Sequence, residues 1–128
     1  MQDRYVGDLG DFGKYALLKS LCSSAFAEPE LRLGVVWYLV ADERKGNDGR
    51  YTDYLKDTGQ NGARFRRCDP SLYDALRRIV HSEQRGVLSV RTGGVLPTGT
   101  AFYEEPLTFK DVPVKGRLPH RSRWLRGA

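Results

Sequence analysis

The chain has 128 residues, of which 40% are hydrophobic, and a formal net charge of +5. This length predicts one compact domain; no apolar run approaches the roughly 20 residues of a membrane-spanning helix, and the N-terminus lacks the apolar stretch of a signal peptide. Cys22 and Cys68 form no C-x-x-C pair and have no flanking histidines, which argues against a disulfide or a zinc site, so we predict a cytoplasmic protein that contacts no membrane.

The sequence starts with a glycine- and aspartate-rich segment, R-Y-V-G-D-L-G-D-F-G-K-Y at residues 4–15. Its three glycines allow a positive φ or a close approach to a ligand, and Asp8 and Asp11 can accept a proton, a metal ion or a hydroxyl donor. A purely structural explanation is that Asp11 caps a helix and the glycines shape the turn before it. The segment is therefore both a candidate site and a candidate helix start.

Apolar residues then recur at three- and four-residue spacing: Phe12, Tyr15, Leu18, Leu21 and Cys22. This periodicity predicts an amphipathic helix of about three turns that begins at Asp11 and ends before the turn E-P-E at residues 28–30. The next run, L-G-V-V-W-Y-L-V at residues 33–40, is continuously apolar and has the length of a strand. It predicts a strand buried on both faces, as in a parallel sheet covered by helices.

A polar loop follows that strand, D-E-R-K-G-N-D-G-R at residues 42–50. In open α/β sheets, ligands bind beyond the carboxyl ends of the strands, so polar residues at this place are candidate ligand contacts. We expect the loop and the segment at residues 4–15 to face each other across one cleft, with Asp11 and Asp42 on its two sides. The alternative is a solvated connection.

A second helix is predicted from Asp69 and Pro70, because an acidic N-cap followed by proline at the first helical position is typical of a helix start. Its apolar stripe consists of Leu72, Tyr73, Leu76, Ile79 and Val80. The arginines at positions 77, 78 and 85 are expected on a solvated basic surface.

Two further extended segments are predicted, a short strand at Gly86–Arg91 and another at Thr100–Glu104. Alternating helices and strands are typical of a doubly wound parallel sheet, so we predict an α/β domain over residues 1–111. Residues 112–128 contain Pro113 and Pro119, which interrupt regular structure, and we expect them to form an irregular tail.

The tail also carries the whole excess of positive charge. It holds no acidic residue and five basic ones, Lys115, Arg117, Arg121, Arg123 and Arg126. Such an arm attracts a polyanion, and Trp124 adds a surface on which a base can stack. These observations predict nucleic-acid contacts through the four arginines and Trp124. A solvated tail is the alternative.

Three segments together resemble a poorly characterised group of prokaryotic and phage proteins. They are residues 4–15 with the following Leu17-Leu18, the strand at 33–40 with N-D-G-R at 47–50, and C-D-P-S-L-Y-D-A-L at 68–76. Members of that group continue past a tryptophan like Trp124 into a strand with an Asp-Pro-Asp-Asn-Gly signature, which this chain does not contain. The layout is also similar to that of ribosomal RNA adenine-N6 methyltransferases.

This second similarity implies a partial Rossmann-like, methyltransferase-like sheet with flanking helices, here truncated. It implies a nucleic-acid-directed methyltransferase that uses S-adenosylmethionine, although the loop after Val40 lacks the Gly-x-Gly run of methyltransferases and the missing strand would leave the isolated chain inactive. Tyr5 or Tyr38 could stack on a target base. The implied catalytic residues are Asp8, Asp11 and Lys14. The implied cofactor contacts are Gly7, Gly10, Asp42, Glu43, Asn47, Asp48 and Gly49.

Two other functions stay open at this point. The acid-x-lysine pattern at residues 43–45, at the end of a predicted strand, also occurs in Mg²⁺-dependent nucleases, where carboxylates bind the metal and position water. Asp8, Asp11, Asp42 and Asp48 could supply further oxygen ligands. The third possibility is a non-catalytic nucleic-acid-binding accessory protein of phage or mobile-element origin.

Overall fold

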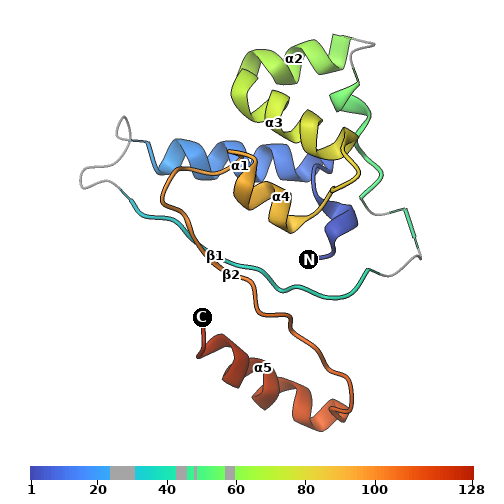
Figure 1. Cartoon of the computed structure of the whole chain (residues 1–128), viewed down its shortest axis with the longest axis vertical. Coiled ribbons are helices and arrows are strands. Elements are labelled where there is room, and N and C mark those ends of the chain that lie inside the picture. The colour runs from blue at the N-terminus through green and yellow to red at the C-terminus, as the bar shows by residue number, and fades with distance from the viewer. Residues whose placement is uncertain (24–30, 43–45, 48, 57–59) are drawn as a thin grey trace.

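The computed structural model describes residues 1–23, 31–42, 46–47, 49–56 and 60–128. Within these ranges the chain is a mixed α/β protein (Figure 1). Its elements are, in chain order, η1 (Asp3–Tyr5), α1 (Leu9–Leu21), β1 (Gly34–Val36), η2 (Asp53–Leu55), α2 (Gln60–Cys68), α3 (Pro70–His81), α4 (Val87–Thr92), β2 (Ala101–Tyr103), η3 (Val114–Gly116) and α5 (Arg117–Leu125).

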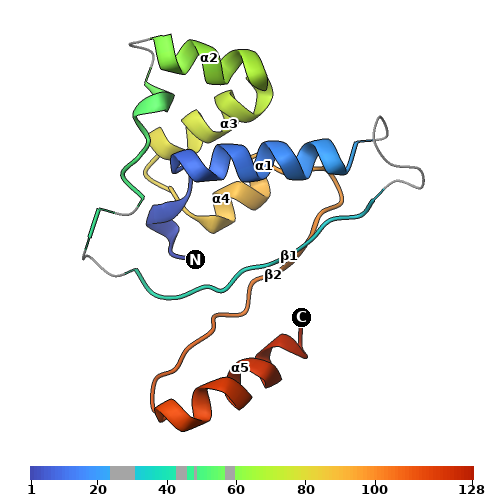
Figure 2. The ribbon, with the colours of Figure 1, turned by 180° about the vertical axis from the view of Figure 1, so that it is seen from behind.

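The elements lie in three layers, which can be followed in both views of the ribbon (Figures 1 and 2). Helices α1 to α4 lie on one side of β1 and β2, and α5 lies on the other side. The core is on the side of the first four helices, where Leu55, Leu72 and Leu76 are fully buried against Phe12 and Tyr73. Among the described residues, no helix is long and apolar enough to cross a membrane.

The described sheet consists of β1 and β2, which pair in parallel with Gly34 opposite Ala101 and Val36 opposite Tyr103. Helices α2 to α4 form the crossover between them, as parallel pairing requires. The strand predicted over residues 33–40 is shorter than expected and is not buried on both faces, since Val36 is 39% exposed. The reason is that the layer on the α5 side covers little of β1, so alternate side chains stay in contact with solvent.

The first helix begins earlier than predicted. Asp8, and not Asp11, is the N-cap of α1, with its side chain accepting a hydrogen bond from the Gly10 N–H at 3.4 Å. Asp11 is already in the first helical turn. Both residues are of a type that is common at an N-cap. Asp8 is fixed in that position by a hydrogen bond from the N–H of Gly49, a residue distant in sequence. The predicted turn at residues 28–30 lies outside the described residues.

The predicted strand at Gly86–Arg91 is wrong, because these residues belong to helix α4 and its N-cap. Val87 and Val90 are buried, whereas Leu88 between them is 65% exposed. Burial at three-residue spacing follows the period of a helix, and a strand would have buried every second residue. A run of six residues is too short to distinguish the two patterns in sequence.

The second predicted helix is confirmed as α3. The Asp69 side chain accepts a hydrogen bond from the Leu72 N–H at 2.9 Å, and Pro70 occupies the first helical position. Most of the predicted apolar stripe is buried, including Leu72, Leu76 and Ile79. The extended segment predicted over residues 100–104 is confirmed as β2.

The prediction that residues 112–128 form an irregular tail is wrong, because Arg117–Leu125 form helix α5. Pro119 is the third residue of this helix. The first N–H groups of a helix have no intrahelical acceptor, so a proline at this position costs no hydrogen bond. The proline in the sequence therefore marks the start of a helix and not its interruption.

Candidate functional site

The glycine-rich N-terminal segment folds back on itself at Gly7. This residue has a φ of +79°, and its N–H donates a hydrogen bond to Oδ2 of Asp11 at 3.0 Å. A Cβ atom at this position would lie 2.3 Å from Cγ2 of Val80. Positive φ and this close approach both require glycine. The carbonyl of Gly7 accepts a further hydrogen bond from the Tyr54 hydroxyl at 3.2 Å.

Asp8 joins this segment to the polar loop after β1. Its Oδ2 accepts a hydrogen bond from the Gly49 N–H at 3.1 Å, in addition to its capping contact with α1. Gly49 also has a φ of +79°, and a Cβ atom there would lie 2.3 Å from the Arg4 carbonyl oxygen. The structure therefore brings together two segments that the sequence analysis expected to be neighbours.

A third segment contributes Arg85, which the sequence analysis placed on a solvated surface. Its Nε donates to the Val6 carbonyl and its Nη2 to the Gly49 carbonyl, both at 2.7 Å. Burial lowers the pKa of the Arg85 guanidinium, and the nearby carboxylates of Asp8 and Asp11 oppose this shift. The sequence indicates this bridging role of Arg85 only weakly, because an arginine just outside a helix is typical of a solvent-exposed surface. We call Gly7, Asp8, Asp11, Gly49 and Arg85 the N-terminal cluster.

Asp42 lies beside the N-terminal cluster. Its Oδ1 accepts a long contact from the Arg4 N–H at 3.5 Å, and its charge acts on Arg85 together with those of Asp8 and Asp11. Asp11 and Asp42 are therefore on the same side of the molecule. The exposed Asn47 accepts a hydrogen bond from the Arg50 N–H through its backbone carbonyl, at 3.2 Å.

Three predicted cofactor contacts remain, Gly10, Glu43 and Asp48. Gly10 is exposed on the first turn of α1, where a Cβ atom would approach nothing closer than Cε of Lys14, at 4.0 Å. Glu43, Lys45 and Asp48 lie outside the described residues, and so does the acid-x-lysine pattern. No group of three His, Cys, Asp or Glu side chains that could hold a metal ion occurs among the described residues. The Mg²⁺-dependent nuclease stays a prediction.

Of the predicted catalytic residues, Asp11 and Lys14 line a pocket of about 250 Å³ beside α1. Nζ of Lys14 lies 2.6 Å from Oδ1 of Asp11, and the Asp11 side chain is 3% exposed. Both oxygens of this carboxylate are therefore paired within the protein. The contacts of Asp8 and Asp11 are those of a helix cap and a turn, which is the structural role that the sequence left open beside a catalytic one.

The wall of the same pocket contains Tyr15 and Trp37. The Tyr15 hydroxyl and the Trp37 Nε1 are buried, and neither has a hydrogen-bond partner among the residues that the structure describes. Burial, followed by the charge of Asp11, raises the pKa of Tyr15 above its ordinary value, so the phenol keeps its proton. Neither residue could be assigned to a pocket from the sequence, because both fit a buried core equally well.

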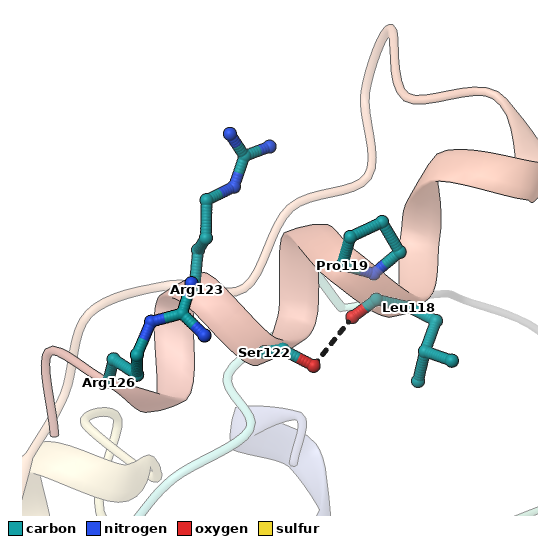
Figure 3. A pocket seen from close by; sticks show the side chains of 5 residues that line it. All are labelled: Leu118, Pro119, Ser122, Arg123 and Arg126. Carbon is teal, nitrogen blue, oxygen red and sulfur yellow. Dashed lines mark hydrogen bonds between the residues drawn. The ribbon is translucent and has the colours of Figure 1, made fainter.

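The second candidate surface is on α5. The side chains of Arg121, Arg123 and Arg126 are exposed, and Arg117 lies over the ring of Phe109 at 5.6 Å. Figure 3 shows Arg123 and Arg126 extending from the helix beside a shallow hollow, whose wall includes Ser122 with its hydroxyl donating to the Leu118 carbonyl at 3.0 Å. The described ion pairs involve none of these four arginines.

Trp124 attaches α5 to the sheet. Its ring lies 5.0 Å from that of Tyr38 and 5.1 Å from that of Tyr103, measured between centroids. Its Nε1 donates to the Glu105 carbonyl at 2.9 Å, and the Tyr103 hydroxyl donates to the Trp124 carbonyl at 3.3 Å. Because Tyr38 and Trp124 contact each other, base stacking on either ring stays a prediction on which our proposals do not depend.

The chain matches no protein-family model, no curated protein and no solved structure. The resemblances found in the sequence therefore stay predictions, and the geometry of the chain itself supports the functional arguments below.

Proposed function

We propose that this protein binds nucleic acid through the exposed arginines of α5. The observation that carries the proposal is the charge of residues 112–128, which combine five basic residues with no acidic one. Four of the basic residues belong to α5 or its C-cap, and all four are exposed and lie outside the described ion pairs: Arg117, Arg121, Arg123 and Arg126. A polyanion can therefore contact these guanidinium groups without first breaking an internal ion pair.

The geometry of the helix suits contacts with phosphates. Arg123 and Arg126 are three residues apart and therefore lie near each other on the helix surface. Arg126 follows Trp124 by two residues, which places the two side chains on nearly opposite faces of a helix. With Trp124 held against Tyr38 and Tyr103, this pair of arginines is presented to solvent. Arginine forks bind phosphate oxygens well, and such contacts carry no sequence preference of their own.

The test is a salt titration of binding to a short DNA duplex, measured by fluorescence anisotropy. Replacing Arg123 and Arg126 by glutamine should reduce the slope of log K against log salt by about 2, since each lost phosphate contact accounts for roughly 0.9. The matched control replaces Arg64 and Arg67, two exposed arginines with the same spacing on α2. An unchanged slope in the α5 variant, or an equal reduction in the α2 control, would overturn the proposal.

Methyl transfer to nucleic acid is a second candidate. It is favoured by the parallel pairing of β1 and β2 across a helical crossover, which is the connection used throughout Rossmann-like sheets. Calorimetric titration with S-adenosylmethionine tests this candidate separately. Saturable binding that is lost on replacing Asp11 with alanine, in a variant that still unfolds cooperatively, would support it, and absence of heat would argue against it.

A further inference from the structure

Strand β1 has one edge that the rest of the described chain leaves open. The Leu33 carbonyl and the Trp37 N–H bond to β2, at 2.9 and 3.1 Å. Since successive residues of a strand direct their backbone groups to opposite edges, Gly34 and Val36 direct theirs away from β2. Both residues are exposed, and their N–H and carbonyl groups form no hydrogen bond among the described residues. An open edge of this kind is a template for a further strand.

Met1 shows that the same edge accepts a backbone a few residues further along. Its amino group donates to the Tyr38 carbonyl, and its carbonyl accepts from the Val40 N–H at 3.1 Å. The Leu39 carbonyl, between these two residues, instead accepts from the Leu107 N–H, which follows β2. Met1 therefore lies on the side away from β2, in line with the open edge.

The pocket beside α1 borders this edge. It has a volume of about 250 Å³, and its wall includes Met1 at the edge, Val35 and Trp37 from β1 and the residue after it, and Leu17 and Leu18 from α1. Most of the side chains in this wall are apolar, and Leu17 is 60% exposed. A strand added beside β1 would direct every second side chain toward α1, where it would cover this apolar wall.

Positive groups flank the open edge at both ends. The exposed Arg32 precedes Gly34 by two residues and takes part in none of the described ion pairs. The amino group of Met1 lies at the other end. At the pocket, the carboxylate of Asp11 is already paired with Lys14. A second copy of the chain would bring like charges together here, whereas an acidic strand would gain opposite ones.

We propose that an extended acidic segment of a partner protein adds to the open edge of β1 as a further strand, with its apolar side chains in the pocket beside α1. Main-chain hydrogen bonds to Gly34 and Val36 provide affinity, and the pocket and the flanking positive groups select alternating apolar and acidic residues. The arginines of α5 lie on the other side of the strands (Figures 1 and 2), and the site does not depend on nucleic-acid binding there.

The first experiment measures amide hydrogen exchange of the whole chain with a short, blocked peptide of alternating glutamate and valine. At saturation, the peptide should slow the exchange of the Gly34 and Val36 N–H groups by about tenfold or more, because both become hydrogen-bonded. The Trp37 N–H is already bonded to β2 and should change by less than about twofold. This alternation indicates strand addition, since a ligand confined to the pocket leaves the edge N–H groups in water.

Modified peptides separate backbone pairing from side-chain contacts. One peptide is methylated on every valine nitrogen and another on every glutamate nitrogen, so that only one of the two loses the N–H groups that face β1. That peptide should bind about tenfold or more weakly than the unmodified one, and the other should bind nearly unchanged. A peptide of alternating lysine and valine should also bind at least about tenfold more weakly at low salt.

A Leu17→Glu variant tests the pocket. It places a charge on the apolar wall and should weaken binding of the glutamate–valine peptide by about tenfold. The control, Leu88→Glu, adds the same charge on α4 outside the pocket, at a residue that is 65% exposed, and should leave the affinity unchanged.

Unchanged exchange at Gly34 and Val36, equal binding of both methylated peptides, equal binding of the lysine peptide, or equal affinities of the two variants would each overturn the proposal. Protection of the same N–H groups without peptide, rising with protein concentration, would overturn it in favour of a second copy of the chain. The exchange and peptide measurements use the unmodified protein, so they do not require that any variant folds.

Discussion

The N–H of Gly49 donates a hydrogen bond to the carboxylate of Asp8 across 41 positions of sequence, at a distance of 3.1 Å. The carbonyl of the same glycine accepts a hydrogen bond from Arg85. Gly49 thus uses both backbone groups to hold the start of α1 and the segment before α4 together. The N-terminal cluster is therefore a structural junction of three distant parts of the chain.

The first prediction separates the roles of the glycines in the segment at residues 4–15. Gly7→Ala should destabilise the protein by more than about 1 kcal/mol, because alanine strains a positive φ and its Cβ meets Val80. Gly13→Ala should stabilise it by about 0.5–1 kcal/mol, because this position lies inside α1 with nothing within 4 Å of the added Cβ. Urea unfolding midpoints measure both effects, and equal effects of the two substitutions would contradict the assignment.

The second prediction concerns Arg85. Replacing it with methionine removes two charged hydrogen bonds and leaves the carbonyls of Val6 and Gly49 without their donor, so we expect a loss of about 2 kcal/mol in the free energy of unfolding. Arg78→Met on the exposed surface of α3 is the control and should change stability by less than about 0.5 kcal/mol. If both variants unfold at the same urea concentration, Arg85 is not part of a structural junction.

The third prediction is a pH dependence from the N-cap of α3. Burial works against the charge of Asp69, but hydrogen bonds from Lys19, the Leu72 N–H and Ser71 outweigh it and lower the pKa of this carboxyl below the ordinary value of an aspartate. The unfolded state then binds the proton more readily, so the stabilisation is complete above that value and is lost as the pH falls through the lowered pKa. Asp69→Asn should show a shallower loss of stability than the unmodified protein between about pH 5 and pH 2. Parallel curves for the two proteins would contradict this.

The fourth prediction addresses how α5 is held. Trp124→Ala removes two ring contacts and the hydrogen bond to Glu105, so the arginine-rich helix should detach and become accessible to trypsin. Leu125→Ala, next to it and 40% exposed, should leave the cleavage rate nearly unchanged. Cleavage after Arg121 and Arg123, followed by mass spectrometry, distinguishes the two outcomes. Equal rates in both variants would show that Trp124 does not attach the helix.

Some of this structure follows from local sequence patterns. The acidic cap, the proline and the apolar spacing at α3 all indicate the same helix, so it could be predicted together with its first residue. At α1 two aspartates fit the cap equally well, and the choice depends on Gly49, a residue distant in sequence. At α4 the apolar residues are too few to separate a helical period from a strand period.

In the candidate sites, too, some features follow from local sequence patterns and others do not. The basic surface of α5 is visible in composition, although Pro119 hides the helix that carries it. The neighbourhood of Asp11 and Asp42 could be expected from the rule that places ligands beyond strand ends. The role of Arg85 and the pairing of Tyr15 with Trp37 in one pocket could not, because both depend on which elements pack together and no local pattern records that.

The bond between Arg85 and the Val6 carbonyl spans 79 positions and has a consequence for the order of folding. During synthesis, the glycine-rich start of the chain leaves the ribosome long before the arginine that fixes it. Contacts of such large sequence separation form slowly, because the intervening chain must first be brought together. The first helix must therefore wait, only loosely held, for the third and fourth helices to arrive, and the ribosome-bound chain is most exposed to proteases and aggregation in that interval.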